Sequence, residues 1–385
     1  MILGYYGQTF PYTVVGFLAV CLLIAILNYF SIRRFDKFPT AQHFPRVSIL
    51  VPARNEELNI RTCVESLLAQ EYADFEVLVL NDNSSDQTAA ILEQISRRDA
   101  RLTVLDGVTP PAGWLGKHWA CHQLAQRASG ELILFTDADT RHEPNALRDS
   151  VSALIAQNAD LVTGFPRQEM LTWGEKLTVP ILAFGVFCFF PIVLAEKLRL
   201  PALSVTIGQF MLFRRSSFEA IGGYEAVRHH PVDDIKLGHN IIAQGFRWQF
   251  MDASHHVTCR MYHGYSDALN GFTRTIFASF DHHVLLYCIG WSWIAISYLA
   301  PIYILFLAMI SPMNFPTTLA VIAVGEALLM IWLAYRRFRI PEYLVLLYPI
   351  SLLIFTWIAF RSLAYTLVGR QSWKDRGMPA PKYKL

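Results

Sequence analysis

A run of 20 residues without a charged side chain, from Pro11 to Phe30, constrains this chain more than any other feature. Such a run is long enough to cross the hydrocarbon core of a bilayer as a helix. It follows no basic segment and precedes no small-x-small cleavage motif, so we expect a retained anchor rather than a signal peptide. Three more apolar runs lie near 284–310, 315–335 and 341–363. The sequence therefore predicts a multi-pass membrane protein.

The composition agrees with this division of the chain. With 53% hydrophobic and 17% charged residues, the chain is more apolar than an ordinary soluble protein. The middle segment carries charges throughout and is long enough to form a domain with its own core. We therefore expect four parts, which are an N-terminal anchor (1–35), a soluble domain (40–280), C-terminal transmembrane helices (284–368) and a basic tail (369–385).

Basic residues after the first span give the expected orientation. Arg33, Arg34, Lys37 and Arg46 follow that span directly, so the positive-inside rule places the soluble domain in the cytoplasm at the cell membrane. The tail is also basic, yet one span before the domain and three after it would put the tail on the opposite side. Three solutions stay open: a re-entrant last run, a preceding run that is not a simple crossing, or a tail that breaks the rule.

A further apolar stretch, 177–196, lies inside the soluble segment. Pro180 and Pro191 interrupt it, and charged residues flank it on both sides. We expect a helix in the membrane interface near a lipid-binding mouth, and a buried core helix is the alternative.

Strand and helix patterns alternate through the first half of the domain. Alternation of this kind predicts an α/β fold with a mainly parallel sheet covered on both faces. The glycine-rich GxGxxG and GxxxxGK[ST] phosphate loops are absent from the sequence. The expected strands are 47–51 (ended by Pro52), 75–80, 102–105 and 132–136, and the expected helices are 56–70, 119–128 and one that starts at Ser84, Ser85 or Asp86 and ends near Arg98.

The fourth strand ends in two carboxylates, Asp137 and Asp139. Side chains at i and i+2 of an extended segment point the same way, so these two can converge on one point. Convergent carboxylates repel each other unless a cation lies between them, and a hard divalent cation that also carries a phosphate is the natural occupant. Taken alone, such a pair is more often a solvated turn than a metal site, and the neighbouring motifs are what favour the metal.

Polar residues follow the other strands as well. Because the carboxyl ends of parallel strands share one edge of the sheet, we expect these residues to surround one site. A lysine in a Gly-Trp-Leu-Gly-Lys motif could pair with phosphate there. The residues are Pro52, Arg54, Asn55 and Glu56 after the first strand, Asp82 after the second, and Lys117 in the motif.

Adjacent aspartates at Asp233 and Asp234 have two interpretations. They could cap the helix that follows them. Alternatively, one could be a general base that removes the proton of an acceptor hydroxyl, while the neighbouring carboxylate keeps its proton affinity high.

The ordered set PARNE, DNSSD, GWLGK, DAD and DDxxL resembles the family 2 glycosyltransferases, which have a GT-A (Rossmann-like) fold. The resemblance covers roughly 45–275. It implies inverting transfer of a sugar from a nucleotide-diphospho-sugar with Mg²⁺ or Mn²⁺. The resemblance further implies that Pro52–Glu56 and Asp82 hold the nucleoside and Lys117 meets the diphosphate.

The same resemblance implies that Asp139 is the main metal ligand, supported by Asp137, and that Asp234 is the base. A histidine between 255 and 263 could add a metal ligand. The segment from Arg260 to Arg274 resembles membrane glycosyltransferases that act on carotenoids and hopanoids, so either arginine could meet the diphosphate. An alternative role for both is to anchor an amphipathic helix at the membrane.

A second resemblance is discounted. Gln244, Arg247 and Trp248 match the QxxRW motif of processive synthases and ceramide glucosyltransferases, but they follow Asp234 more closely than in those enzymes. The same residues also read as the start of a strand.

The sequence thus predicts transfer of a hexose, from a donor such as a UDP-hexose, to the hydroxyl of a membrane lipid such as a carotenoid or another isoprenoid. The bilayer is an expected partner and nucleic acid is not. Three alternatives remain, which are a processive polysaccharide synthase, a ceramide or sphingolipid glucosyltransferase, and a nucleotide-sugar-binding protein without activity.

Overall fold

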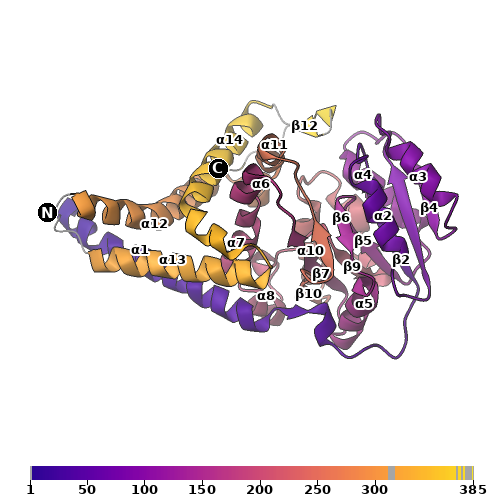
Figure 1. The fold of residues 1–385 in the computed structure, drawn as a ribbon, viewed down its shortest axis with the longest axis horizontal. Helices are drawn as coiled ribbons and strands as arrows, with labels where there is room; N and C mark the ends of the chain where they lie inside the picture. Colours follow the sequence, from indigo (N-terminus) through magenta and orange to yellow (C-terminus); the bar gives the residue numbers. More distant parts are fainter. Residues whose placement is uncertain (1, 311–316, 370–371, 374–375, 378–383, 385) are drawn as a thin grey trace.

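The computed structural model describes residues 2–310, 317–369, 372–373, 376–377 and 384. Long helices project from one side of the molecule and an α/β domain forms the other side (Figure 1). Most of the basic tail predicted over 369–385 lies outside the described residues.

The domain is built on an eight-stranded sheet in the order β1-β10-β7-β9-β5-β2-β3-β4. All neighbours pair in parallel except around β9, which is antiparallel to both β7 and β5. The predicted mainly parallel α/β architecture is confirmed. The strands are β1 (Arg33–Arg34), β2 (Val47–Ala53), β3 (Phe75–Asn81), β4 (Leu102–Asp106), β5 (Leu132–Phe135), β7 (Leu161–Phe165), β9 (Met211–Arg214) and β10 (Trp248–Asp252).

Short strands form two smaller sheets. One has the order β6-β11-β8 and lies beside the ends of the main strands, and the other joins β12 to β13. Their bounds are β6 (Thr140–His142), β8 (Arg167–Gln168), β11 (Val257–Cys259), β12 (Ser372–Trp373) and β13 (Arg376–Gly377).

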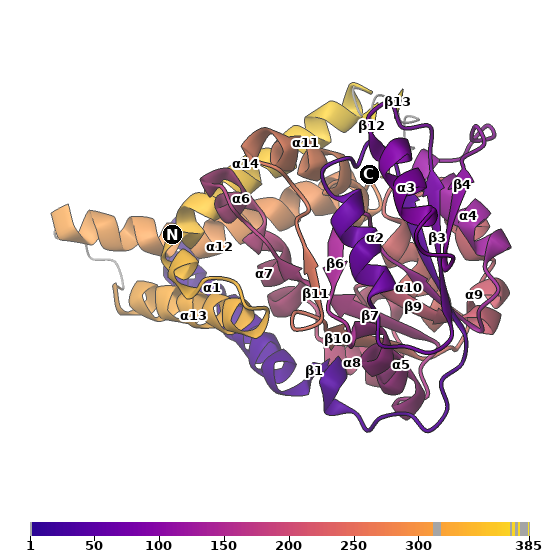
Figure 2. The same ribbon diagram turned by 45° about the vertical axis from the view of Figure 1, so that its right-hand side comes forward.

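Helices cover both faces of the main sheet (Figure 2). Alternate residues of one strand point to opposite faces, so Ile49 of β2 packs in one core and Leu50 in the other. The first core includes α2 (Ile60–Leu68), α3 (Thr88–Ser96) and α5 (Ala146–Ala156). The second includes α4 (Gly116–Arg127) and α10 (Asp233–Ala243), and it continues into the long helices. One apolar core therefore joins the sheet to the helices that project from it.

Shorter helices connect these elements. The α-helices are α6 (Trp173–Thr178), α7 (Pro180–Phe189), α8 (Ile192–Leu198), α9 (Arg215–Ala220) and α11 (Tyr265–Thr275), and the 3₁₀ turns are η1 (Phe35–Lys37), η2 (Pro201–Leu203), η3 (Gly223–Val227), η4 (Ala278–Phe280) and η5 (Glu342–Leu347).

Within the part of the chain that the structure describes, four helical segments are long and apolar enough to cross a membrane. They match the four apolar runs predicted from the sequence. They are Phe10–Ser31 within α1 (Ile2–Ser31), α12 (Val284–Ile310), α13 (Thr317–Arg337), and Glu342–Leu367, which comprises η5 and α14 (Tyr348–Leu367).

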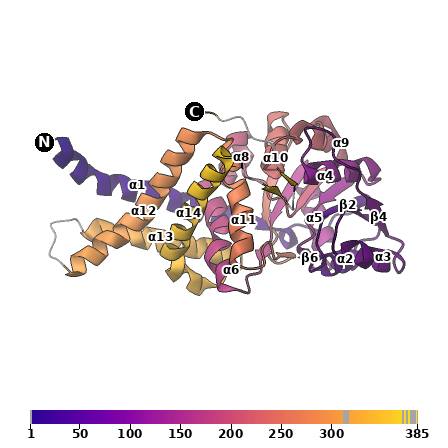
Figure 3. The same cartoon turned by 90° about the horizontal axis from the view of Figure 1, so that it is seen from above.

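Helix α14 differs from α1 and α13 in direction. It runs across α1 and α13 rather than alongside them (Figure 1), and it lies with α11 between the long helices and the sheet (Figure 3). The Ser362 hydroxyl donates to the carbonyl of Thr273 in α11 at 2.6 Å, and the Tyr287 hydroxyl of α12 donates to the carbonyl of Ala359 at 2.8 Å. The last part of α14 is thus attached to the domain.

The apolar stretch predicted as one interfacial helix over 177–196 is two helices. The segments Trp173–Phe189 and Ile192–Leu198 meet at a bend of 52°. Helix α7 is buried against α1 and α13, as the core-helix alternative expects. Helix α8 exposes apolar side chains, including 43% of Leu194 and 58% of Leu198.

The buried amide of Asn28 in α1 holds the break between α7 and α8. Its Nδ2 donates to the carbonyls of Phe187 and Phe190, both at 2.8 Å. Its Oδ1 accepts from the backbone N–H of Ile192 at 3.2 Å. A helix break inside an apolar region leaves backbone groups that need partners, and this single side chain supplies three of them.

Several predicted boundaries are wrong by a few residues. Strand β2 does not end at Pro52 but continues to Ala53, because its ladder with β5 stops at Leu50 and only the ladder with β3 continues. The helix predicted over 56–70 begins at Ile60. Helix α3 has Gln87 at its N-cap, while Asp86 accepts from the backbone N–H of Thr88 at 3.0 Å.

Candidate active site

The loops after β2 and β3 interlock. Arg54 donates from Nη1 to the carbonyl of Asp82 at 2.7 Å. The backbone N–H of Asn55 donates to Ser84 Oγ at 3.0 Å, and Asn55 adopts a left-handed conformation with φ of 51°. Asparagine tolerates this conformation better than most residues. The two loops therefore form one polar rim at the edge of the sheet, as the sequence predicted.

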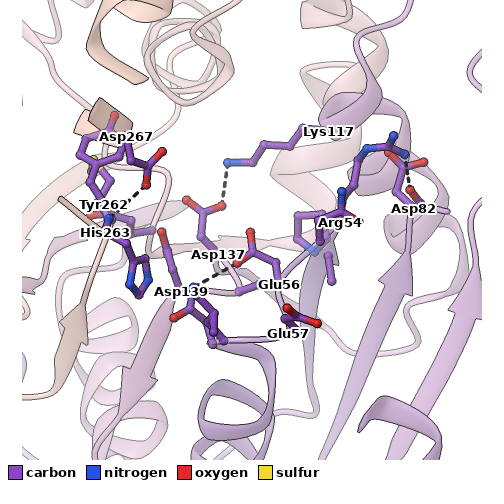
Figure 4. A pocket seen from close by; sticks show the side chains of 18 of the residues that line it. Arg54, Glu56, Glu57, Asp82, Lys117, Asp137, Asp139, Tyr262, His263 and Asp267 are labelled. Atoms are coloured by element: carbon purple, nitrogen blue, oxygen red, sulfur yellow. Dashed lines mark hydrogen bonds and ion pairs between the residues drawn. The ribbon is translucent and has the colours of Figure 1, made fainter. Parts of the chain in front are cut away.

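A cavity of about 560 Å³ opens at this edge. Figure 4 shows its side chains, with Lys117 reaching from α4 toward Asp137 and with Asp139 and Glu56 below. It gathers nine of the predicted site residues and also Glu57, Asn59, Gln209, Met261, Tyr262, His263, Asp267 and Thr275. The nine are Pro52, Arg54, Asn55, Glu56, Asp82, Lys117, Asp137, Asp139 and Arg274.

The carboxylates of Asp137 and Asp139 lie on a turn, not on the strand itself. Strand β5 ends at Phe135, and the Thr140 hydroxyl closes the turn by donating to the carbonyl of Asp137 at 2.8 Å. Both side chains nevertheless line the same cavity. The carboxylates of Asp137 and Asp139 therefore face one space, as predicted. They do so from a turn and not from the extended strand that the prediction assumed.

Charge in this cavity is unevenly balanced. Lys117 Nζ lies 2.6 Å from Asp137 Oδ1. Burial would lower the pKa of Lys117, but Asp137 and Asp233 raise it above its ordinary value. Burial, followed by the charges of Asp137 and Glu56, raises the pKa of Asp139 to about 8. Lys117 therefore does not cancel the repulsion of Asp139 by Asp137 and Glu56, and a cation bound at Asp139 would reduce it.

Asp137 and Asp139 fit a divalent cation that is also coordinated by the phosphates of a bound substrate. Within the residues that the structure describes, no group of three or more histidine, cysteine, aspartate and glutamate side chains is arranged to hold a metal ion. Mg²⁺ commonly binds through one or two carboxylates together with substrate phosphates, and Asp137 and Asp139 match that pattern. Among the histidines considered as further ligands, His263 lines the cavity, whereas His255 contacts Arg34 and His256 contacts Asp149.

A second cavity, of about 430 Å³, adjoins the first. Its lining is mainly apolar, with Leu182 and Val186 from α7 and Phe272 from α11, and Asp233 and Asp234 also line it. The two cavities have five lining residues in common, which are Lys117, Met261, Tyr262, Arg274 and Thr275. A polar space and an apolar space therefore meet at one wall, with aspartates on both sides of it.

Asp234 is held by backbone amides. Its Oδ2 accepts from the N–H of Gly208 at 2.9 Å, and its Oδ1 accepts from the N–H of Ile235 at 2.8 Å. Burial, followed by the charge of Asp233, raises the pKa of Asp234 to about 7. The N-cap position of α10 is Val232, so neither aspartate occupies it.

Asp233 has a different environment although it is adjacent. Its Oδ1 lies 3.6 Å from Nε2 of His118, and both side chains are buried. Burial would raise the pKa of Asp233, but His118 and Lys117 lower it below its ordinary value. The two aspartates thus have pKa values displaced in opposite directions, a pattern common in catalytic carboxylate pairs.

Other predicted residues lie apart from both cavities. Arg260 lines a separate polar pocket beside Asp139 and forms an ion pair of 3.2 Å with Glu175. Of the two predicted arginines, Arg274 lines the two adjoining cavities and Arg260 does not. In the QxxRW segment, the Trp248 indole donates to Thr206 Oγ1 at 3.1 Å, and neither Arg247 nor Trp248 lines the two cavities.

Sequence reasoning missed three contributors to the site. His118 directly follows Lys117 in the chain, which was a usable signal. Gly208 supplies an amide to Asp234 and follows no recognisable motif. Tyr262 stands in the shared wall, and a Cβ at Gly271 would lie 2.2 Å from its ring, so a larger residue there would force Tyr262 to move.

The mainly parallel sheet, with carboxylates and a lysine gathered at its strand ends, defines a GT-A type of fold. Residues 48–222 match the family described as Glycosyl transferase family 2. The resemblance predicted from the sequence is confirmed over these residues.

Two curated relatives resemble the chain. It is 26% identical to the probable glycosyltransferase YdaM of Bacillus subtilis (strain 168) over 216 residues, which are 55% of this chain and 50% of that protein. It is also 26% identical to the 4,4'-diaponeurosporenoate glycosyltransferase of Staphylococcus aureus (strain MRSA252) over 240 residues, 59% of this chain and 60% of that protein. The chain thus matches between half and three fifths of the length of these relatives.

A solved structure supports the fold. The mannosyltransferase PcManGT from Pyrobaculum calidifontis, in complex with GDP-Man and Mn²⁺, superposes with a TM-score of 0.53. The sequences are 16% identical, and the superposition covers 95% of this chain and 99% of that one. At this identity the likeness shows the fold alone.

Proposed function

We propose that this protein transfers a hexose from a nucleotide-diphospho-sugar to the hydroxyl of a membrane lipid. The observation that carries the proposal is the pair of adjoining cavities. The polar one suits a charged nucleotide sugar, and the apolar one suits a lipid. Carboxylates on either side of their common wall supply the two functions that such a transfer needs, charge compensation and proton removal.

In this proposal the polar cavity holds the donor. The interlocked loops of Arg54, Asn55 and Asp82 would bind the nucleoside, and Lys117 and Arg274 would meet the diphosphate as positive charges. Arg274 is preferred over Arg260 because only Arg274 lines the cavity. A divalent cation bound by Asp137 and Asp139 would stabilise the negative charge that develops on the departing nucleotide.

The apolar cavity would hold the acceptor. A lipid chain lying along α7 would contact Leu182 and Val186 and present its hydroxyl to Asp234. The hydroxyl oxygen would form a bond to the anomeric carbon as the bond from that carbon to the phosphate oxygen breaks. Asp234 would receive the proton, since its two backbone hydrogen bonds fix its orientation and its pKa of about 7 suits a general base at neutral pH.

The membrane helices suggest how a lipid reaches this cavity. Helix α7 lines it and packs against α1 and α13, so the acceptor space borders the apolar bundle. We further propose that α14 lies along the cytoplasmic boundary of the bilayer instead of crossing it. The domain and the basic tail would then lie on the same side of the bilayer. This arrangement would remove the conflict between the number of spans and the positions of the basic residues.

Labelling would test that arrangement. A cysteine introduced at Gly369, just after α14, should react with a membrane-impermeant maleimide from the domain side of sealed vesicles. Reaction only from the opposite side would show that α14 crosses the bilayer.

The catalytic proposal is tested with the full chain in membranes or detergent. It is incubated with radiolabelled UDP-glucose, UDP-galactose or GDP-mannose and a total bacterial lipid extract, with and without Mn²⁺. GDP-mannose belongs in the panel because the structurally similar mannosyltransferase was solved with GDP-Man. We expect label in the lipid phase, with one hexose per acceptor by mass spectrometry.

Two variants distinguish the proposed roles. Asp234→Asn should abolish transfer while donor binding stays nearly unchanged. Asp139→Ala should abolish transfer and also weaken donor binding. Full activity of Asp234→Asn would refute the base assignment. Polymeric products would point to a synthase, and bound donor that is never turned over, in water or lipid, would point to a binding protein.

A further inference from the structure

We propose that Arg361 of α14 is a positioning residue for the donor, because it fixes the backbone of α11 and thereby directs Arg274 toward the diphosphate. This inference rests on the proposed function, in which Arg274 meets the diphosphate. It assigns a role in donor binding to a helix outside the site, since α14, which the structure describes in full, contributes no residue to the lining of either adjoining cavity.

The position of the Arg274 side chain is set by the backbone that carries it. Arg274 is half-buried and lines both cavities. Among the described residues, no hydrogen bond or ion pair holds its guanidinium group. A side chain without such contacts is placed by its backbone and its rotamer. Whatever fixes the end of α11 therefore decides where this positive charge is offered to a ligand.

Arg361 contacts three residues on one face of α11. Its Nη1 donates to the Thr273 hydroxyl at 2.6 Å and to the carbonyl of Leu269 at 3.4 Å. Its Nη2 donates to Asn270 Oδ1 at 3.3 Å. Residues three and four apart lie on the same side of a helix, so these contacts define the face of α11 that is turned to α14. A single guanidinium group thus holds the last full turn of α11 before Arg274.

Ser362, the next residue of α14, holds the end of the same helix. Its hydroxyl donates to the carbonyl of Thr273 at 2.6 Å and accepts from the backbone N–H of Phe277 at 3.2 Å. Helix α11 ends at Thr275, where backbone groups need partners from outside the helix. Ser362 is fully buried, so water does not compete for these bonds. Contacts from α14 therefore fix the chain on both sides of Arg274.

Two aromatic rings of α14 orient the guanidinium group of Arg361. Its Cζ lies 4.3 Å from the centre of the Tyr365 ring and 6.0 Å from the centre of the Trp357 ring. These rings are four residues after and four residues before Arg361, so they lie on the same side of the helix. Arginine can stack on aromatic rings and still form several directed hydrogen bonds, whereas lysine is a point charge. The surroundings of Arg361 therefore suit arginine and not lysine.

A double-mutant cycle on nucleotide binding provides the main test. The full chain in detergent is titrated with UDP and with GDP in the presence of Mn²⁺, for the unaltered chain, Arg361→Gln, Arg274→Gln and the double variant. Arg361→Gln should raise the dissociation constant about fivefold, and it should have no further effect when Arg274 is already replaced. Equal weakening in both backgrounds would overturn the proposal, because Arg361 would then act independently of Arg274.

Two further variants separate geometry from charge. Arg361→Lys keeps the positive charge but cannot make the three contacts, so it should weaken binding as Arg361→Gln does. Arg336→Gln is the matched control, because Arg336 also stacks on a ring of its own helix, Trp332 at 5.1 Å, but lies at the end of α13. It should leave the dissociation constant unchanged. Full binding by Arg361→Lys, or equal weakening in Arg336→Gln, would overturn the proposal.

A measurement without nucleotide tests the contacts themselves. Hydrogen exchange of the amides of residues 270–275 should accelerate in Arg361→Gln and stay unchanged in Arg336→Gln. Unchanged exchange in Arg361→Gln would overturn the proposal, because other contacts would then fix α11. The two proposals can also fail separately, since the cycle requires nucleotide binding but no transfer. Coupled binding without any transfer would refute the reaction alone, and additive effects in a chain that transfers sugar would refute this inference alone.

Discussion

Replacing Asn28 by leucine should destabilise the junction between the domain and the long apolar helices. The side chain has no exposed surface and makes three hydrogen bonds, to the carbonyls of Phe187 and Phe190 and from the N–H of Ile192. Leucine has the same branching but is larger, and it satisfies none of these groups. Hydrogen bonds between membrane helices contribute about 0.6 kcal/mol on average and about 1.7 kcal/mol at most. Three of them give a loss of about 2–5 kcal/mol.

Two assays would measure this loss. The free energy of unfolding, from denaturant titration in detergent, should fall by that amount. Hydrogen exchange should accelerate at the amide of Ile192, because it loses its acceptor. Leu23→Ala, at a position of the same helix that is 56% exposed, is the control and should change neither quantity greatly. Unaltered stability together with unaltered protection at Ile192 would refute the assignment of Asn28 as the residue that holds the break.

Three further predictions follow from the site. Asp139→Asn should remove the stabilisation against heat that Mn²⁺ gives the unaltered chain with a nucleoside diphosphate, and an unchanged Mn²⁺ effect would argue for other ligands. The rate of transfer should increase as the pH rises through about 7. Burial and the charge of Asp233 raise the pKa of Asp234 to about that value, and the base acts only when it is ionised. A rate that stays constant between pH 5 and pH 8 would contradict this prediction. Gly271→Ala should lower stability by about 1–3 kcal/mol by pushing Tyr262 aside, whereas Gly290→Ala, whose nearest neighbour atom is 3.6 Å away, should be tolerated, as denaturant titration of both would show.

The longer strands and helices could be predicted because each contains enough residues for its hydrophobic pattern to be recognised. The strands near Val47, Phe75 and Leu132 are mostly apolar, with a single polar residue near the start of each of the first two. The helices that could span a membrane are longer than most core helices. The strands β6, β8 and β11 contain two or three residues each, too few for a period to show. Their pairing is set by tertiary contacts that join residues far apart in the sequence.

The site residues that could be predicted are those that directly follow a predicted strand. Asp82, Asp137 and Asp139 come together because parallel strands end at one edge, a consequence of topology alone. The break between α7 and α8 could not be placed, because the residue that satisfies it, Asn28, stands in a helix more than a hundred positions earlier. The proximity of His118 to Asp233 was equally hidden, since it depends on how α4 packs beside α10.

The wall that separates the two cavities makes their occupants interdependent. Because Tyr262 and Arg274 face both spaces, a ligand on one side alters the shape and charge offered to the other. Thermodynamic reciprocity then requires that whatever factor a nucleotide imposes on lipid affinity, the lipid imposes on nucleotide affinity. Binding of the two substrates should accordingly be cooperative, in the positive or the negative sense, without any rearrangement of the sheet beneath them.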